Sequence, residues 1–185
     1  MRVVAVEGSA RAAKLAREAM RRNGFENKVT VVCGRIEDEA VAEEVGAALS
    51  QRHPGGLSAT GGPPTADVIV SEWMGYMLVY EDMFRSVAVA RDRWLHPDGC
   101  MIPAKCSVWA APFCGRDLAD ELAGFWRRKP YGLDMQHLIG PAMEEVCARP
   151  VIDELAPQCL LARPAQLWRL DCRADPADVA SSQCL

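Results

Sequence analysis

Two glutamates, Glu72 and Glu81, stand nine positions apart in a stretch that is otherwise mostly apolar and aromatic. On one continuous helix, at about 100° per residue, their side chains would point to opposite sides, so a helix cannot bring the carboxylates together. A loop that doubles back through Gly75 can. Two converging carboxylates suit a cationic, planar ligand with several donors, and a guanidinium fits this description better than an ammonium.

Such a carboxylate pair can also activate the guanidinium. Arginine stays protonated in proteins, with a pKa above about 12, so a nucleophilic nitrogen requires that positive charge be gathered on another nitrogen. Paired carboxylates do this, and they hold the reacting nitrogen in line with an electrophile. The alternative is that Glu72 is only a strand-end charge and that Glu81 opens a helix together with Asp82.

Apolar and aromatic residues surround this pair, and we expect them to form a desolvating wall around the charged site. They are Trp73, Met74, Tyr76, Met77, Leu78, Val79 and Tyr80. Each residue singly is as well explained as ordinary core. The whole run is harder to explain in that way, because loops are normally polar.

Two further acids follow apolar, β-branched runs. Glu7 comes directly after residues 3–6, at the carboxyl end of an expected strand, where doubly wound sheets bind the ribose of their ligands. Glu37 follows the strand-like residues 29–32 closely, where it can reach the exocyclic amine of an adenine. The alternative for both acids is a helix N-terminal charge.

Alternating strands and helices are expected to position these four acids. Residues 3–6, 29–32 and 67–71 are expected strands, the first buried on both faces. Helices are expected from Ser9 to Gly24, over 37–49, and from Glu81 to the turn at 96–99. The first helix should bury one face, formed by Ala12, Leu15, Ala16, Ala19 and Met20. This order is typical of a doubly wound α/β sheet.

The character of the sequence changes near residue 100. A strand at 106–111, a helix at 116–128 with large apolar side chains, and a strand at 166–172 indicate a different, antiparallel architecture. We therefore predict a ligand-binding domain over 1–102 and the start of a second domain over 103–185. The Gly-, Pro- and Ser-rich residues 51–65 read as a flexible insertion.

Composition limits the classes of function. The chain has 185 residues, half of them apolar, so it can bury a core. Its net charge of −4 and its lack of a basic run argue against direct nucleic-acid binding. The eight scattered cysteines form no metal-ligand pattern, so no metal is expected and they read as reduced thiols. No signal peptide or membrane span is recognisable, which favours the cytoplasm or the nucleus.

The string Ser71-Glu72-Trp73-Met74-Gly75-Tyr76, with Glu81 and Met83 after it, resembles the double-glutamate loop of the type I protein arginine methyltransferases. Further segments resemble the same family: residues 4–7, 36–37, 90–99, 125–126 and 131–135. The likeness is closest to the nuclear subgroup known as member six. It covers nearly all of the chain except the insertion and the tail.

The resemblance implies a Rossmann-like methyltransferase sheet followed by the start of a β-barrel with a helical dimerisation arm over 115–146. It implies methyl transfer from S-adenosylmethionine to protein arginine, giving S-adenosylhomocysteine with monomethyl and asymmetric dimethyl products. Glu7 with Gly8 would bind ribose, Ile36 and Glu37 the adenine, and Glu72 and Glu81 the guanidinium. Trp73, Met74, Tyr76 and Met83 would line the pocket, with Met83 restricting the product. Histones or glycine-arginine-rich proteins would be the substrates, and the helix at 116–128 would form a homodimer.

The resemblance also implies a chain truncated at both ends. The family's glycine-rich first strand precedes the position of Met1, and its Thr-His-Trp loop follows the last residue. We expect impaired activity, and poor stability or association through unpaired strand edges. The alternative is a non-catalytic fragment or binding module that dimerises with a full-length enzyme. Another adenosylmethionine-dependent methyltransferase would explain Glu7 but not Glu72, Gly75 and Glu81 together.

Overall fold

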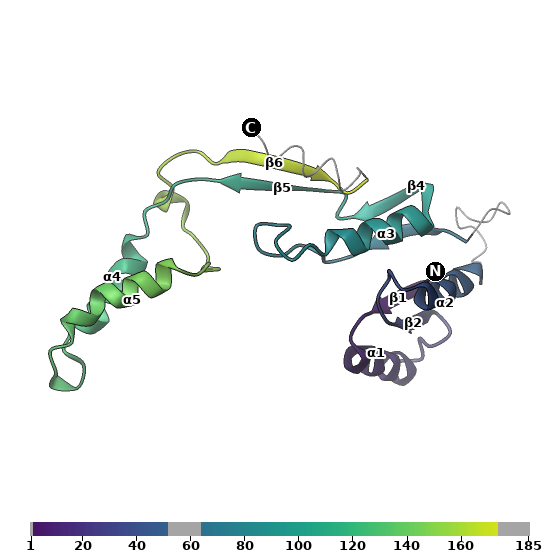
Figure 1. Cartoon of the computed structure of the whole chain (residues 1–185), viewed down its shortest axis with the longest axis horizontal. Coiled ribbons are helices and arrows are strands. Elements are labelled where there is room, and N and C mark those ends of the chain that lie inside the picture. The colour runs from purple at the N-terminus through teal and green to yellow at the C-terminus, as the bar shows by residue number, and fades with distance from the viewer. Residues whose placement is uncertain (1, 52–63, 174–185) are drawn as a thin grey trace. The chain divides into compact units, whose positions relative to one another are not determined.

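A computed structural model of the chain describes residues 2–51 and 64–173 (Figure 1). The chain divides into two compact units, one formed by Met1–Val108 with Trp168–Leu185 and the other by Trp109–Leu167. The predicted domain boundary after residue 102 stays a prediction. The predicted insertion at 51–65 lies almost entirely outside the described residues.

The first unit begins with a parallel βαβ motif, as predicted. Strands β1 (Val3–Glu7) and β2 (Val29–Cys33) pair in parallel, with Glu7 opposite Cys33. Helix α1 (Ala10–Arg22) connects them, and Ser9 caps it by accepting a hydrogen bond from the Ala12 N–H at 3.3 Å. Gly24 follows the helix with a φ of +69°, a left-handed conformation that glycine adopts without strain.

The face by which α1 packs differs from the prediction. Ala13 is completely buried, whereas Leu15 is 62% exposed. Arg17 explains the difference, because its guanidinium donates to the Val31 carbonyl at 2.9 and 3.1 Å and so fixes the rotation of the helix on β2. The prediction that the first strand is buried on both faces is also wrong, since Val3 is 40% exposed.

Helix α2 (Glu39–Ser50) packs into one of two hydrophobic cores of this unit, which is called the second hydrophobic core. Five buried residues from three elements form it: Val32, Val41, Ala42, Val45 and Trp94. Trp94 is the last residue of helix α3 (Phe84–Trp94), so this core joins α3 to the βαβ motif. An ion pair between Arg93 and Glu39, at 3.1 Å, bridges the same two helices on the surface.

Strands β3 (Ala66–Val70) and β4 (Leu95–Ile102), which precede and follow α3 in the sequence, form a second parallel pair. The predicted turn at 96–99 lies inside β4 as an irregularity, because Leu95 pairs with Ala66 while Cys100 already pairs with Val68. The helix therefore ends where the sequence indicated. The chain continues as a strand rather than as a free turn.

Among the described residues, the two parallel pairs are not joined into one sheet. Within the described residues β1 pairs only with β2, and β3 only with β4. Val68 and Val70 are consequently 46% and 70% exposed, although an inner strand of a doubly wound sheet would bury them. The predicted α/β class is confirmed, and the fold is partial.

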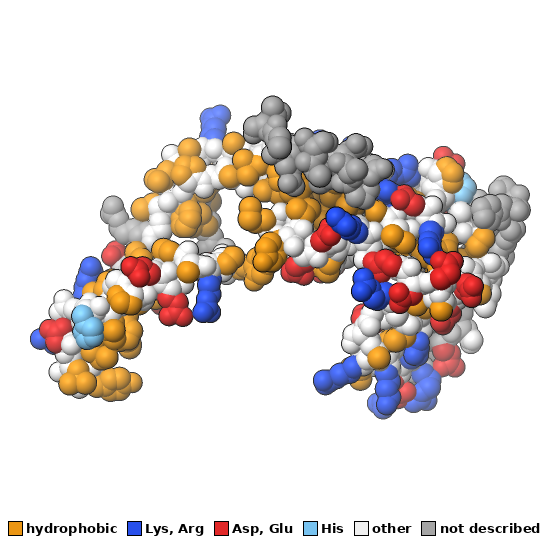
Figure 2. All heavy atoms as spheres, in the orientation of Figure 1, with side chains coloured by type: hydrophobic (Ala, Val, Ile, Leu, Met, Phe, Trp, Pro, Cys, Tyr) orange, Lys and Arg blue, Asp and Glu red, His pale blue; other side chains and the backbone are white. Residues whose placement is uncertain are grey.

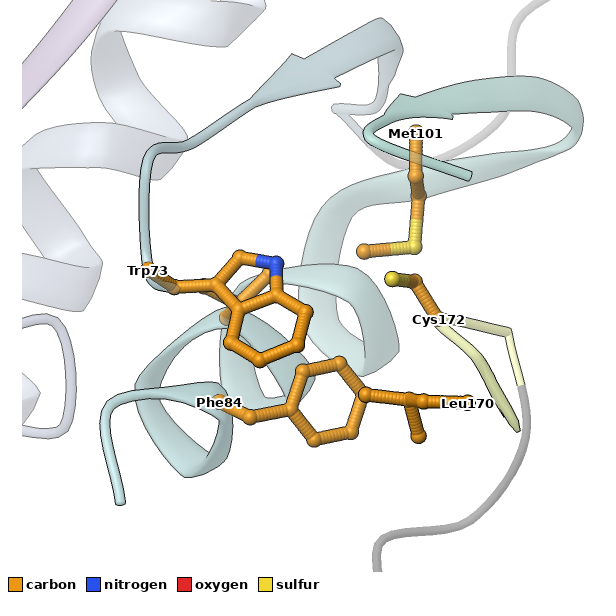
Figure 3. Packing of buried hydrophobic residues seen from close by; sticks show 6 residues of the cluster. Trp73, Phe84, Met101, Leu170 and Cys172 are labelled. Atoms are coloured by element: carbon orange, nitrogen blue, oxygen red, sulfur yellow. The ribbon is translucent and has the colours of Figure 1, made fainter. Parts of the chain in front are cut away.

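The first hydrophobic core lies beneath the segment that follows β3 (Figure 3). Its buried residues are Trp73, Phe84, Val87, Met101, Leu170 and Cys172. Strand β6 (Ala165–Asp171) supplies Leu170, and it forms a two-stranded sheet with β5 (Lys105–Ala110). Residues from the end of the described chain thus support the segment that carries Glu72 and Glu81.

The second unit is mainly helical. It contains α4 (Arg116–Arg127), α5 (Ile139–Cys147) and three short 3-10 turns, η2 (Pro130–Gly132), η3 (Gln136–Leu138) and η4 (Pro157–Cys159). Helix α4 was predicted and α5 was not. Hydrophobic side chains are exposed over this unit, with Phe125 46% and Tyr131 95% exposed (Figure 2).

The described part of the chain contains no helix of sufficient length and hydrophobicity to cross a membrane. The predicted barrel and dimerisation arm stay predictions.

Candidate functional site

The two acids predicted to hold a nucleoside lie at, or shortly after, the carboxyl ends of the neighbouring strands β1 and β2. Glu7 ends β1 and pairs with Cys33, the last residue of β2. The Gly34 N–H extends this pairing by donating to the Glu7 carbonyl at 3.0 Å. Glu37 comes shortly after, so both acids lie at the carboxyl edge of the same parallel pair, as predicted.

Glu7 is partly buried and already makes one hydrogen bond. Its Oε1 accepts the backbone N–H of Ser9 at 2.7 Å, at the start of α1. This is the helix N-terminal role that the sequence left open as an alternative, and it also fixes the direction of the carboxylate. The backbone beside it is accessible, because a Cβ placed on Gly8 would meet nothing within 4 Å.

Glu37 is held by a residue that the sequence did not indicate. The hydroxyl of Ser86, on α3, donates a hydrogen bond to Glu37 Oε1, and Arg35 Nε lies 3.6 Å from Oε2. The hydrogen bond from Ser86, helped by a backbone N–H and by Arg35, lowers the pKa of the Glu37 carboxyl. Ile36 is partly buried against the second hydrophobic core, so its side chain anchors the segment.

The loop after β3 doubles back at Gly75, as predicted. The Gly75 N–H donates to the Leu78 carbonyl at 3.1 Å, and the Leu78 N–H donates to the Gly75 carbonyl at 3.0 Å. The Tyr80 N–H bonds to the Tyr76 carbonyl at 3.1 Å. The loop is therefore held largely by its own backbone hydrogen bonds.

This loop carries unusual backbone conformations. Met77, Leu78 and Asp82 have φ values of +48°, +70° and +53°, a region that residues other than glycine rarely adopt. Each such residue costs on the order of 1–3 kcal/mol and persists only where the surroundings impose it. Such clusters of strain are most frequent at functional sites.

The turn places the Glu81 carboxylate against Gly75. A Cβ on Gly75 would lie 3.0 Å from both Cδ and Oε1 of Glu81. The loop therefore brings Glu81 back to Gly75, which is three positions from Glu72 in the sequence. Glu72 and Glu81 are both exposed, which keeps their carboxylates accessible to a ligand.

The residues predicted to line the pocket occupy different depths. Trp73 is 2% exposed, and its ring lies 4.9 Å from that of Phe84 in the first core (Figure 3). It supports the loop from beneath. Met74 is partly buried. Tyr76, between Glu72 and Glu81 in the sequence, is 47% exposed, and Met83, two positions after Glu81, is 36% exposed.

The two halves of the site are connected through α3. Ser86, which holds Glu37, is five positions after Glu81 on the same continuous segment, and Met83 lies between them at the start of the helix. The sequence contained no signal for this link, because Ser86 and Glu37 are 49 positions apart.

Two further observations concern described residues outside the predicted site. A cavity of about 510 Å³ lies elsewhere, lined by residues around Gly99, Lys105 and Asp171, and includes none of the predicted site residues. In the described ranges, no group of three or more His, Cys, Asp or Glu side chains is arranged to hold a metal ion.

Curated relatives of the chain carry a consistent name. This chain is 36% identical over 172 residues to "Probable protein arginine N-methyltransferase 6" of Arabidopsis thaliana, a match that covers 93% of this chain and 34% of that protein. It is 34% identical over 173 residues to "Protein arginine N-methyltransferase 6" of Xenopus laevis, covering 92% and 44%. The chain thus spans less than half the length of these relatives. It matches no family model.

Solved structures with the same fold agree with these relatives. A crystal structure of PRMT6 with SAH superposes with a TM-score of 0.71 at 25% identity, covering 96% of this chain and 52% of that one. Arabidopsis thaliana protein arginine methyltransferase 10 gives 0.61 at 30% identity, covering 96% and 50%. A Trypanosoma brucei PRMT1 enzyme-prozyme heterotetramer with AdoHcy gives 0.62 at 26% identity, covering 96% and 48%.

Proposed function

We propose that this chain, a homologue of the protein arginine N-methyltransferases over 92–97% of its length, carries the arginine-binding loop and the nucleoside-binding edge of such an enzyme. The reaction is transfer of a methyl group from S-adenosylmethionine to a guanidino nitrogen of a protein arginine. One observation carries the proposal above the others. The Glu81 carboxylate folds back over Gly75, in a loop whose following helix holds Glu37 through Ser86.

The residues at the carboxyl edge of β1 and β2 fit the nucleoside half of this cofactor. Glu7 would accept the ribose hydroxyls, and the open backbone at Gly8 leaves room for the sugar. Glu37 would accept the adenine amine, with Ile36 beneath it; its lowered pKa keeps it ionised as an acceptor. S-adenosylmethionine supplies the methyl group when bound. The PRMT6 structure with SAH and the PRMT1 complex with AdoHcy support this choice of cofactor.

Glu72 and Glu81 would bind the substrate guanidinium. Each carboxylate accepts N–H groups, so positive charge gathers on the bonded nitrogens and the lone pair of the remaining nitrogen becomes available. At that nitrogen a carbon–nitrogen bond would form as the bond between the cofactor's sulfur and its methyl group breaks, with S-adenosylhomocysteine as the leaving group, and the methylated nitrogen would then lose one proton to water. The carboxylates also hold the nitrogen in a fixed direction, which is a positioning contribution.

The side chains around the loop would shape the arginine pocket. Met74, Tyr76 and Met83 would line it, while Trp73 would support it from the core. Met83 stands at the junction of the loop and α3, where its bulk would restrict how many methyl groups one nitrogen receives. Monomethylarginine and asymmetric dimethylarginine are the proposed products.

The proposed partners follow from the same family. Substrates would be arginine-containing proteins such as histones or glycine-arginine-rich proteins, in the nucleus or the cytoplasm. The exposed aromatic side chains of the second unit support a homodimer through the helix at 116–128. The Trypanosoma brucei PRMT1 complex is a heterotetramer, which supports association of this chain with another subunit.

Calorimetric titration of the 185-residue chain with S-adenosylmethionine tests the nucleoside edge. We expect saturable binding that Glu7→Ala and Glu37→Gln weaken at least tenfold, since each removes hydrogen bonds to a charged acceptor worth about 1.5–3 kcal/mol. Glu43→Gln, on the exposed surface of α2, is the matched control and should bind normally. Binding that neither Glu7→Ala nor Glu37→Gln affects would refute the assigned edge.

Transfer of labelled methyl groups to a glycine-arginine-rich peptide tests the loop. We expect label in the peptide with the native chain, and Glu72→Gln or Glu81→Gln should reduce its rate by at least a hundredfold, in the range of effects for lost positioning and charge stabilisation. Cofactor binding should remain. If the native chain binds cofactor but transfers nothing, the alternative of a non-catalytic binding module is favoured.

A further inference from the structure

Glu81 occupies its position without a polar anchor. Glu7 and Glu37 each accept a hydrogen bond, but within residues 2–51 and 64–173 no hydrogen bond or ion pair holds the Glu81 carboxylate. A long, exposed side chain of this kind normally samples several rotamers. Something other than hydrogen bonding must therefore restrict it if it is to bind a ligand in a fixed direction.

The Glu81 side chain lies beside the backbone of Gly75. A Cβ on Gly75 would lie 3.0 Å from Cδ, 3.0 Å from Oε1 and 3.1 Å from Cγ of Glu81. Ordinary contacts between carbon atoms are about 3.5–4.0 Å, so a methyl group at this position would press on the carboxylate, which would have to move by a few tenths of an ångström. The Glu81 side chain therefore borders the space that a side chain at position 75 would need.

The glycine is not required here by its backbone conformation. Gly24, Gly34 and Gly132 are the described glycines with positive φ, and Gly75 is not among them. Its amide and carbonyl pair with Leu78, a bond pattern that any L-residue can make. What only glycine provides at this position is the missing side chain.

We propose that Gly75 is the positioning residue of the Glu81 carboxylate. Its bare backbone, fixed by the two hydrogen bonds to Leu78, is the surface against which Glu81 folds back toward Glu72. A methyl group there shifts the carboxylate within the arginine site while leaving the turn intact. The inference rests on the proposed function, because it assigns a role within the same arginine-binding loop.

Nuclear magnetic resonance of the 185-residue chain tests the position directly. We expect a nuclear Overhauser effect between the Gly75 α-protons and the Glu81 γ-protons, and a large change of the Glu81 side-chain shifts in Gly75→Ala. Gly46→Ala is the matched control, since a Cβ there meets nothing within 4 Å. Absence of the native contact, or unchanged Glu81 shifts in Gly75→Ala, would overturn the proposal.

Titration with an acetylated Gly-Arg-Gly peptide tests the consequence. Gly75→Ala should weaken binding by about threefold to tenfold, less than the roughly hundredfold loss that follows a 1 Å misplacement, because the carboxylate shifts by only a few tenths of an ångström. Adding Glu81→Asp, which shortens the side chain by one methylene, should restore part of the affinity. A merely structural role of Gly75 predicts no such rescue, and its absence would overturn the proposal.

Two outcomes separate this inference from the proposed function. If the native chain shows the contact between Gly75 and Glu81 but binds no arginine peptide, the proposed function fails while the positioning role stands. If Gly75→Ala does not fold, Gly75→Ala/Glu81→Ala decides the matter. The double variant folds if the collision with the carboxylate is the cause, and a double variant that remains unfolded refutes it.

Discussion

The carboxylates on the two sides of the site are held in different ways. At the carboxyl edge of β1 and β2, Glu7 bonds to the Ser9 N–H and Glu37 bonds to Ser86. In the loop after β3, Glu72 and Glu81 are exposed and Glu81 rests against Gly75. The first side is fixed by hydrogen bonds, and the second by backbone geometry and steric contact.

This difference matches the ligands that the two sides are proposed to bind. Neutral hydroxyl and amine groups need acceptors that already point in one direction, and a bonded carboxylate provides them. A cationic guanidinium instead needs carboxylates with most of their acceptor capacity unused. The shape of the loop depends on positive φ values at Met77, Leu78 and Asp82. Glu7 and Glu37 are instead held by polar partners.

Phe84→Ala should give the largest effect, because it removes the core beneath the loop. Phe84 is 5% exposed and packs against Trp73 with ring centroids 4.9 Å apart. Loss of a buried phenylalanine costs about 3–5 kcal/mol. We expect a fall of this size in the free energy of unfolding, measured by urea denaturation. Phe25→Ala, at a residue that is 44% exposed, is the control and should cost less than half as much.

Gly34→Ala should damage the opposite side, where β2 turns toward Glu37. Gly34 has a φ of +145°, and a Cβ there would lie 2.5 Å from Cγ2 of Val41. Backbone strain and overpacking together should cost about 2–4 kcal/mol, measured by the same denaturation.

The control for Gly34→Ala is Gly46→Ala, which lies in α2 with open space around the added methyl group. Alanine is the better helix former, so this variant should gain about 0.5–1 kcal/mol. Equal effects of the two substitutions would contradict the assigned close contact.

Ser86→Ala should remove the polar anchor of Glu37 and bring this carboxylate closer to the condition of Glu81. The pKa of Glu37, which Ser86 lowers in the native chain, should rise toward 4.5, as measured by carbon-detected titration of the carboxyl group. A hydrogen bond to a charged group contributes about 1.5–3 kcal/mol when buried, and less for this partly exposed carboxylate.

The pH dependence of stability gives the sign of the same effect. Because the folded-state pKa of Glu37 is lowered, its contribution is present above the unfolded pKa and is lost as pH falls through the folded pKa. The native chain should therefore lose more stability than Ser86→Ala on acidification below pH 4.5. Ser50→Ala, at an exposed hydroxyl on α2, should follow the native curve.

Met77→Gly should give the smallest effect and sharpen the account of the loop. Met77 is 77% exposed with a φ of +48°, so glycine relieves strain while losing little packing. The relief is partly offset by the greater backbone entropy of glycine, and we expect a net gain of at most about 1 kcal/mol. A loss of stability would mean that the Met77 side chain contributes more than its exposure indicates.

Much of the fold was predictable because it depends on local patterns. The apolar run before Glu7, the capping serine at position 9 and the left-handed Gly24 define the βαβ motif from neighbouring residues alone. Helix α5 was not predicted. The prediction that Leu15 lies on the buried face of α1 was wrong, because Arg17 on this helix bonds to a carbonyl on another element. Patterns of hydrophobicity do not encode such long-range hydrogen bonds.

The sequence by itself determined which residue types stand in the arginine loop and that this loop must turn at Gly75, since nine residues of helix would separate Glu72 from Glu81. Only the tertiary structure decided how the acids are held. The Ser86 bond to Glu37, the burial of Trp73 and the contact of Glu81 with Gly75 join atoms from segments that the chain brings together by folding. Hydrogen bonds and steric contacts depend on distances of a few ångströms, and sequence spacing does not fix such distances across separate elements.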